Sequence, residues 1–262
     1  MQGRARREAG FPGERFVFDA TPDPGSTDQV HWSGGGDPST GTGKRFTTTF
    51  GQGGTYQVTA TSGSETRSFE VQVAPLEQWL ADAAGFYGPS VDLSKVTVKA
   101  TWAVFGPSGT GWTCNTVVRF KRAKRMEDLP VEPTLMHELG HVWEHQSGQL
   151  QLLKGIVEQL GRMFGRDPYD YGGPDGVRKA SKLTRFKKEG QAQIIMEHWK
   201  AVNGYDSDSK GVSLFTPGYA DDLRRLVEGA GIGRTAADRR TVARAIDSGF
   251  ARTLNSLLGV ME

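Results

Sequence analysis

The chain has 262 residues, of which 36% are hydrophobic and 24% are charged, and its formal net charge at pH 7 is +2. This composition is typical of a folded protein with one or two domains, and the near balance of charge argues against a nucleic-acid partner. Cys114 is the single cysteine, which excludes an intrachain disulfide framework and a multi-cysteine zinc site. No apolar run approaches the ~18 residues of a membrane-spanning helix, so we expect no membrane span.

Short apolar runs separated by turn residues characterise the first part of the chain. Several of them alternate apolar with polar side chains, as half-buried strands do. The candidate strands cover residues 15–20, 29–32, 45–50, 56–61 and 69–73. Their regular spacing predicts an all-β sandwich over residues 1–75.

One motif within this region points to a known kind of module. The run Phe50-Gly-Gln-Gly-Gly-Thr-Tyr56-Gln-Val58 resembles the F-x-x-x-G-x-Y-x-V pattern of polycystic-kidney-disease (PKD) and related immunoglobulin-like modules. The sequence departs from these modules at Trp32, which is followed by Ser-Gly-Gly-Gly instead of an acidic run. The resemblance therefore implies an immunoglobulin-like fold but no binding residues, and we expect Trp32 and Tyr56 to pack in the core. Such a module could contact a partner protein or a secretion machinery.

The pattern changes at Pro75. Residues 76–86 place apolar groups at helical spacing, and two strand-like runs follow at Val96–Trp102 and Asn115–Phe120. We expect one of these two runs to be the edge strand on which an extended peptide could lie.

From Pro133 onward the sequence is mostly helical. An amphipathic helix is expected over Leu150–Phe164, and two further helices near the end, with Thr235 as an amino-terminal cap. We therefore divide the remainder into a domain at residues 76–205 and a helical segment packed on it at residues 206–262.

The segment that carries chemistry is the motif H-E-x-x-H, formed by His137, Glu138 and His141. Four residues along a helix advance about 6 Å and turn about 400°, so both imidazoles project from nearly the same face and can share one Zn²⁺. Glu138 lies about 100° around the helix, where it can accept a proton from a water molecule. His145 lies about 12 Å from His137 along the axis, too far to share the ion, and is interpreted as a supporting or surface residue.

A catalytic zinc site needs a third protein ligand, and the sequence offers candidates downstream. Glu189, Glu197 and His198 all lie in the run from Lys188 to Trp199. Spacing alone leaves these three open, and an ordinary surface carboxylate is the default interpretation of Glu197.

Paired motifs around the histidines resemble a family. The run Leu135-x-His-Glu-Leu-Gly-His-Val-Trp, with Asn115-Thr-Val-Val-Arg-Phe before it and Tyr169-Asp-Tyr171 and Glu189-x-Gln-Ala after it, resembles gluzincin-type metallopeptidase domains. These domains occur in bacterial polymorphic-toxin, Rhs-type and contractile-injection proteins, and the similarity spans roughly residues 95–200. It implies a zincin-like fold, a Zn²⁺ cofactor and Glu189 as the third ligand. Gly190 stands where the family often has Gln, which weakens the helix and spares the ligand.

Two tyrosines near the motif are candidates for a catalytic role. Tyr169 or Tyr171 could donate a hydrogen bond to the oxyanion that forms when water attacks a carbonyl. The competing interpretation is a packed aromatic side chain in a loop.

The sequence therefore predicts an α+β zincin-like metallopeptidase domain behind an amino-terminal immunoglobulin-like sandwich. Its expected activity is zinc-dependent hydrolysis of protein or peptide substrates, as in a bacterial effector or toxin-associated protease. The alternative is an inactive zincin-like metal-binding scaffold that serves delivery or adhesion, but the intact Glu138 favours the enzyme. No apolar stretch follows the basic amino terminus, so we expect no secretory signal in this chain and either a cytoplasmic location or export by a dedicated secretion system.

Overall fold

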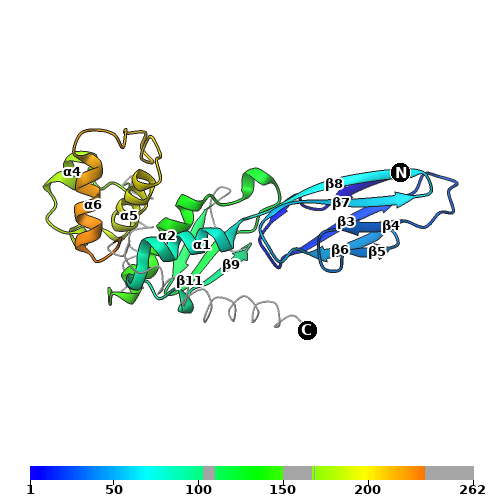
Figure 1. The fold of residues 1–262 in the computed structure, drawn as a ribbon, viewed down its shortest axis with the longest axis horizontal. Coiled ribbons are helices and arrows are strands. Elements are labelled where there is room, and N and C mark those ends of the chain that lie inside the picture. The colour runs from blue at the N-terminus through cyan, green and yellow to red at the C-terminus, as the bar shows by residue number, and fades with distance from the viewer. Residues whose placement is uncertain (103–109, 150–166, 168, 234–262) are drawn as a thin grey trace.

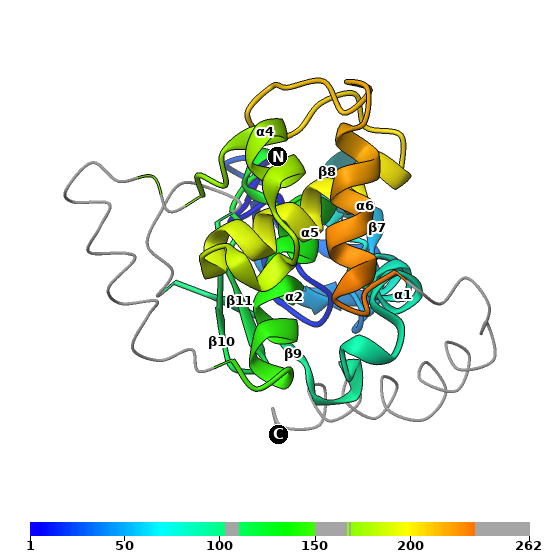
Figure 2. The same cartoon turned by 90° about the vertical axis from the view of Figure 1, so that its left-hand side faces the viewer.

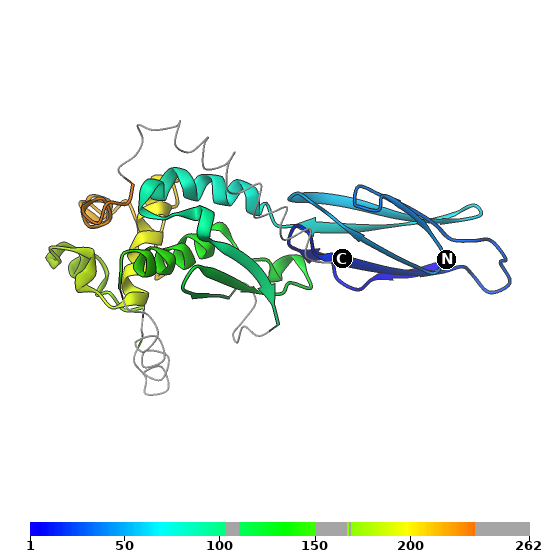
Figure 3. The same ribbon diagram turned by 90° about the horizontal axis from the view of Figure 1, so that it is seen from below.

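The computed structural model describes residues 1–102, 110–149, 167 and 169–233. The protein has a mixed α/β structure, in which strands dominate the chain up to Val73 and helices with a small sheet follow. The strands of the first region lie at one end of the elongated molecule and the helices lie toward the other end (Figures 1 and 3). Within the described ranges, no helix is both long and apolar enough to cross a membrane.

Two sheets make up the first region. One has the strand order β1-β3-β6 and the other the order β2-β8-β7-β4-β5. The strands are β1 Gln2–Ala5, β2 Ala9–Gly10, β3 Arg15–Thr21, β4 His31–Gly34, β5 Thr40–Thr42, β6 Arg45–Thr49, β7 Gly54–Ser62 and β8 Glu65–Val73. The long antiparallel pair β7–β8 runs in register from Gly54 opposite Val73 to Ser62 opposite Glu65.

Residues from both sheets form one hydrophobic core. Trp32 of β4 stacks on Phe46 of β6 with 5.6 Å between the ring centroids, and both are buried together with Phe18. The expected core position of Trp32 is therefore confirmed. Tyr56 is partly buried, and its ring stacks on Phe50 with 4.2 Å between centroids.

Three strands have no counterpart among the candidate strands of the sequence: β1, β2 and β5. The residues of β1 alternate between exposed and half-buried, so they carry no apolar alternation for a sequence pattern to detect. Their order comes from antiparallel pairing with β3, in which Gln2 lies opposite Thr21 and Ala5 opposite Phe18. The remaining strands β3, β4, β6, β7 and β8 overlap the candidate runs.

The second region combines a three-stranded sheet with helices. The sheet has the order β10-β11-β9, with β11 antiparallel to β10 and parallel to β9. Helix α2 packs against this sheet, and α5 packs against both α2 and α6 (Figure 2). The elements are α1 Leu76–Tyr87, β9 Thr97–Thr101, β10 Gly111–Cys114, β11 Val117–Lys121, α2 Glu132–Gln146, α4 Gly173–Lys179, α5 Lys188–Val202 and α6 Tyr219–Gly229, with 3₁₀ turns at Gly88–Ser90, Leu93–Lys95, Met126–Asp128 and Leu183–Arg185.

The structure decides between the two runs of which one was expected to be an edge strand. Asn115 lies in the turn between β10 and β11 with a positive φ of 56°, and β11 is paired on both sides. The run Asn115–Phe120 is therefore not an edge strand, because its backbone groups are used by two neighbours. Among the described strands of this sheet, the two edges are β9, which overlaps the expected run Val96–Trp102, and β10, which was not predicted.

The expected helices at residues 76–86 and after Pro133 correspond to α1 and α2, and Pro133 lies in the first turn of α2. The helix expected over Leu150–Phe164 and the cap at Thr235 lie outside the described residues, so α6 is the described helix of the expected segment 206–262. The two regions have separate buried clusters. The boundaries at residues 75 and 205 stay predictions, as does the relation of the first region to immunoglobulin-like modules.

Candidate metal centre

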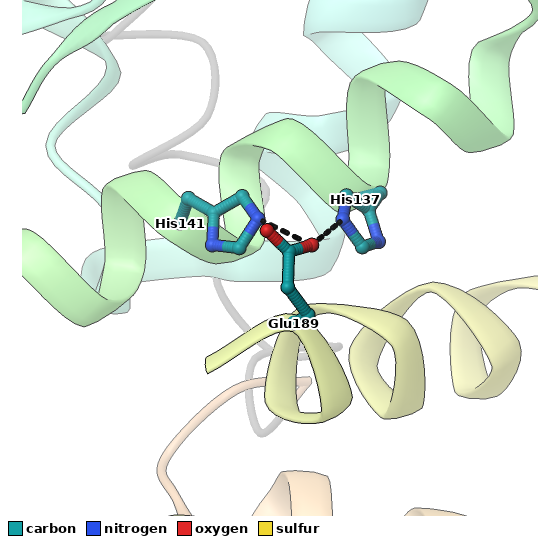
Figure 4. Close-up of side chains that lie close together, drawn as sticks. All are labelled: His137, His141 and Glu189. Carbon is teal, nitrogen blue, oxygen red and sulfur yellow. Dashed lines mark hydrogen bonds and ion pairs between the residues drawn. The ribbon is translucent and has the colours of Figure 1, made fainter. Parts of the chain in front are cut away.

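The three polar residues of the H-E-x-x-H motif lie on α2. This helix is held in place by an apolar stripe, Leu135, Leu139 and Val142, whose side chains have no solvent exposure. Such a stripe at positions i, i+4 and i+7 buries one side of a helix against a core. It leaves the histidines to project from a different side, toward α5 (Figure 4).

Helix α5 brings Glu189 to the histidines because it approaches α2 very closely. At the crossing point stands Gly140, where an added Cβ would lie 2.9 Å from the Cα of Ala192 and 3.1 Å from its Cβ. Only glycine fits this contact without moving the two backbones apart. The close approach of the helices therefore sets the distance from Glu189, on the first turn of α5, to the imidazoles.

His137, His141 and Glu189 converge on one point (Figure 4). The Nε2 atom of His137 lies 3.2 Å from Oε2 of Glu189, and Nε2 of His141 lies 3.4 Å from the same oxygen. One potential ligand atom from each residue lies within 4.8 Å of the others. Part of each side chain remains accessible, since the exposed fractions are 10%, 14% and 16% in chain order.

These separations fit a tetrahedral metal. Ligand atoms at 2.0–2.1 Å from a tetrahedral Zn²⁺ stand about 3.3–3.4 Å apart, close to the two N···O distances of this cluster. Two imidazoles and one carboxylate are also a ligand set known for catalytic zinc, with the fourth position left for water or substrate. The three residues therefore fit a tetrahedral metal ion such as zinc.

The charges of the cluster favour either a bound metal ion or a proton held between the histidines and Glu189. Burial by itself would raise the pKa of Glu189, but the hydrogen bonds of His137 and His141 outweigh burial and hold this pKa well below its usual range. Burial would lower the pKa of His141, but its contacts with Glu144 and Glu189 raise it well above the ordinary value. Without metal, the Glu189 carboxylate is thus paired with the imidazolium of His141, whose proton a bound cation would replace.

Glu138 lies beside the cluster with its carboxylate against β10. The hydroxyl of Thr113 donates a hydrogen bond of 2.6 Å to Oε2 of Glu138. A Cβ on Gly111 would come within 2.6 Å of Oε1 of the same carboxylate, so the strand backbone passes directly over it. The sequence offered no signal for Thr113, because its role depends on the unpredicted strand β10.

The two tyrosines that were candidates for oxyanion binding have different surroundings. The ring of Tyr169 lies 5.8 Å from the ring of His137, centroid to centroid, and so borders the cluster. The hydroxyl of Tyr171 is buried, donates to Oδ2 of Asp208 at 3.0 Å and lies 2.8 Å from the hydroxyl of Tyr219. The structure therefore does not bring the Tyr171 hydroxyl to the metal cluster, because the buried carboxylate of Asp208 holds it elsewhere.

The other candidate ligands are also placed elsewhere, since among the described residues the metal-binding group contains neither His145, Glu197 nor His198. Glu197 is fully buried, contrary to the surface position expected by default. Its Oε1 accepts a hydrogen bond of 2.9 Å from the backbone N–H of Ser209, and Oε2 lies 3.3 Å from Nζ of Lys200. Glu197 thus fastens the loop after α5 to the helix.

Comparison with known proteins gives one similarity of note. No protein-family model matches the chain. The chain is 26% identical over 135 residues to the type VI secretion system spike protein VgrG2b of Pseudomonas aeruginosa. The aligned part covers 48% of this chain and 13% of the length of that spike protein. The similarity fits the contractile-injection context that the sequence predicts.

Proposed function

We propose that this chain is a zinc-dependent metallopeptidase with a zincin-like catalytic region and an immunoglobulin-like sandwich before it. The observation that carries the proposal is the convergence of both histidine Nε2 atoms on one oxygen of Glu189, at 3.2 and 3.4 Å. A site with a purely structural metal has no need for the adjacent Glu138, and a fourth protein ligand would close it. Among the described residues, the cluster has three members.

In this proposal His137, His141 and Glu189 hold Zn²⁺. A bound zinc ion would supply Lewis-acid polarisation of a carbonyl group and would make a water molecule more acidic. Glu138 takes the proton from the attacking water and delivers it to the leaving nitrogen. The Thr113 hydroxyl keeps the carboxylate of Glu138 turned toward β10. We assign assistance at the developing oxyanion to Tyr169, because its ring borders that of His137.

The outer edge of β10, which has no partner strand among the described residues, is the place where we expect an extended peptide to bind. An edge strand offers unpaired backbone groups to which a peptide can add as a further strand. Because Gly111 and Thr113 of β10 contact the Glu138 carboxylate, a peptide on this edge would pass beside the proposed general base. We therefore propose β10 as the peptide-binding edge strand, in place of the two runs that the sequence suggested.

The similarity to VgrG2b supports a role for this activity in bacterial secretion. We propose that the chain reaches its substrate through a secretion machinery, with the sandwich as the part that contacts the machinery or another partner protein. The proposed role is that of a bacterial effector.

The test separates the metal ligand from the general base. Glu138→Gln should retain zinc and lose about 10²–10⁴-fold in turnover, because an amide cannot accept the proton of the water. Glu189→Gln should weaken zinc binding itself, because it replaces a charged oxygen ligand with a neutral one. Zinc content by elemental analysis and cleavage of a peptide library are the two measurements, with Glu127→Gln, an exposed carboxylate, as the control.

Three outcomes would change the proposal. Purified protein that contains no transition metal and takes up none on reconstitution contradicts the zinc site. Loss of zinc in Glu138→Gln, together with full retention in Glu189→Gln, contradicts the assignment of ligands. Wild-type protein that holds zinc but cleaves nothing in broad libraries would favour the inactive scaffold.

A further inference from the structure

Glu144 is a buried carboxylate on α2, one turn beyond the second histidine of the motif. Its side chain has no solvent exposure, and its Oε2 lies 3.1 Å from Nδ1 of His141. The opposite nitrogen of the same ring, Nε2, is the atom that faces Glu189. His141 thus lies between two carboxylates, one on each ring nitrogen.

The fold alone does not account for this carboxylate. Its other oxygen, Oε1, is buried and has no hydrogen-bond partner among the described residues. The nearby hydroxyl of Tyr87 donates instead to the carbonyl of Met136 at 2.6 Å. Burial, with a smaller contribution from the charge of Glu144, raises the pKa of Tyr87 well above its usual range, so this hydroxyl stays protonated and neutral. A buried carboxylate with one of two oxygens unpaired destabilises a core.

The position of Glu144 beside His141 explains why a carboxylate is buried here, which packing alone does not explain. A neutral imidazole carries one proton, and the partner of one nitrogen decides which nitrogen keeps a free lone pair. A carboxylate that accepts from Nδ1–H leaves Nε2 unprotonated, fixes the plane of the ring and raises the basicity of the ligand. These are the properties that a metal ligand at Nε2 needs.

We propose that Glu144 is a positioning residue for the metal centre, which holds His141 in the tautomer and orientation that present Nε2 to the ion. This role rests on the metal site of the proposed function and concerns metal affinity rather than peptide cleavage. The proposal predicts that the free energy of folding gains little or nothing from the Glu144 charge, while metal binding depends on it.

The experiment measures zinc affinity and apo-protein stability in the same set of variants. Competition with a chromogenic chelator gives the zinc dissociation constant, and thermal unfolding of the metal-free protein gives its midpoint. Glu144→Gln keeps the shape and one acceptor oxygen, whereas Glu144→Leu removes the acceptor. Glu132→Gln is the matched control, since Glu132 is a carboxylate of the same helix and lies about 13 Å from His141 along the axis.

We expect Glu144→Gln to weaken zinc binding about 10–100-fold and Glu144→Leu to weaken it further, with Glu132→Gln like the wild type. The apo thermal midpoint of Glu144→Gln should equal or exceed that of the wild type, because a buried carboxylate with one oxygen lacking a partner is replaced by a neutral amide. A residue with a merely structural role would give the reverse, a lower midpoint with unchanged zinc affinity in the folded protein. That result would overturn the proposal. If Glu144→Leu does not fold, the zinc affinity and apo midpoint of Glu144→Gln are sufficient to test the proposal.

The two proposals fail in different ways. Wild-type protein that binds no zinc contradicts the proposed function itself. Wild-type protein that binds zinc while Glu144→Gln binds it within twofold contradicts only the role of Glu144.

Discussion

Two glutamates of α5, Glu189 and Glu197, occupy the same helix but have opposite surroundings. Glu189 lies on the first turn and faces the histidines of α2. Glu197 lies two turns later, has no solvent exposure and accepts from the backbone of Ser209. Spacing along the sequence left both as ligand candidates, although eight residues along a helix advance about 12 Å and leave the two side chains about 80° apart around the axis. The distance to α2 separates them, because only the beginning of the helix reaches the histidine pair.

His198, the third candidate of the same run, is a buried neutral histidine whose role is expected in the pH dependence of stability. Burial, with a smaller contribution from Arg224, lowers its pKa from the ordinary 6.5 to about 4. As pH falls from about 6.5 to about 4, the unfolded chain binds a proton that the folded protein does not bind. Stability is therefore lost with falling pH across this window.

For the metal-free protein we predict that His198→Leu removes this loss. Between pH 7 and pH 4.5 the free energy of unfolding of the wild type should fall by about 2–3 kcal/mol more than that of the variant. Urea unfolding of both proteins at the two pH values measures the difference. Equal losses in the two proteins would contradict a buried, neutral His198.

At the scale of elements, the contact between α2 and α5 decides the metal centre. The helices meet where Gly140 faces Ala192, with no room for a Cβ at the glycine. Gly190, also near the centre on α5, has ordinary contacts instead, since an added Cβ would lie 3.5 Å from the Cβ of Phe186 and 3.6 Å from that of Tyr171. The two glycines thus offer a matched pair.

We predict opposite effects for the two alanine substitutions. Gly140→Ala should force the helices apart, lower stability by about 1–3 kcal/mol and weaken zinc binding, because Glu189 moves away from the histidines. Gly190→Ala should leave zinc binding unchanged and stabilise the protein by about 0.5–1 kcal/mol, because a helical glycine has a high conformational entropy to lose. Denaturant unfolding and zinc titration test both; equal zinc affinity in the two variants would contradict the crossing point as the determinant.

At the scale of the whole molecule, contacts join the sandwich to the second region. The rings of Phe11 and Phe120 stack with 5.9 Å between centroids. Nε of Arg122 lies 3.0 Å from Oε1 of Glu14, and the backbone N–H of Glu8 donates to the carbonyl of Lys124 at 2.8 Å. The contacting residues of the sandwich lie in the first 14 residues of the chain. The same segment carries β1, which pairs with β3, and β2, which pairs with β8.

This arrangement determines which amino-terminal fragment we expect to fold on its own. A fragment of residues 14–75 contains the five strands that the sequence predicts, but it lacks β1 and β2 and so leaves β3 and β8 with unpaired edges. We predict that residues 1–75 unfold cooperatively and that residues 14–75 are less stable by several kcal/mol or do not fold. Thermal unfolding followed by circular dichroism compares the two. Absence of a cooperative transition in the longer fragment would contradict an independent domain at this boundary.

The sequence by itself determined the parts that depend on local spacing. The strands with apolar alternation, the helix after Pro133 and the pairing of His137 with His141 follow from the periods of strands and helices, which any chain with this pattern must obey. The edge strand β10 and the strands β1, β2 and β5 carry no such period. Their order comes from hydrogen bonds to partner strands, which are close in the chain for β10 and β5 and distant for β2, whose partner is β8.

Spacing left three candidate ligands on one helix open, and the resemblance pointed to Glu189. Tertiary structure decided which of the three meets the histidines, which tyrosine borders them, and that Thr113 contacts Glu138. Glu189 and Thr113 act on groups of α2 only when α5 and β10 are in place, whereas Glu144 meets His141 at the i,i+3 spacing within α2 itself. For Glu189 and Thr113 these contacts join residues 52 and 25 positions apart. No local period relates residues so far apart in sequence, so only packing can bring their polar atoms within hydrogen-bonding distance.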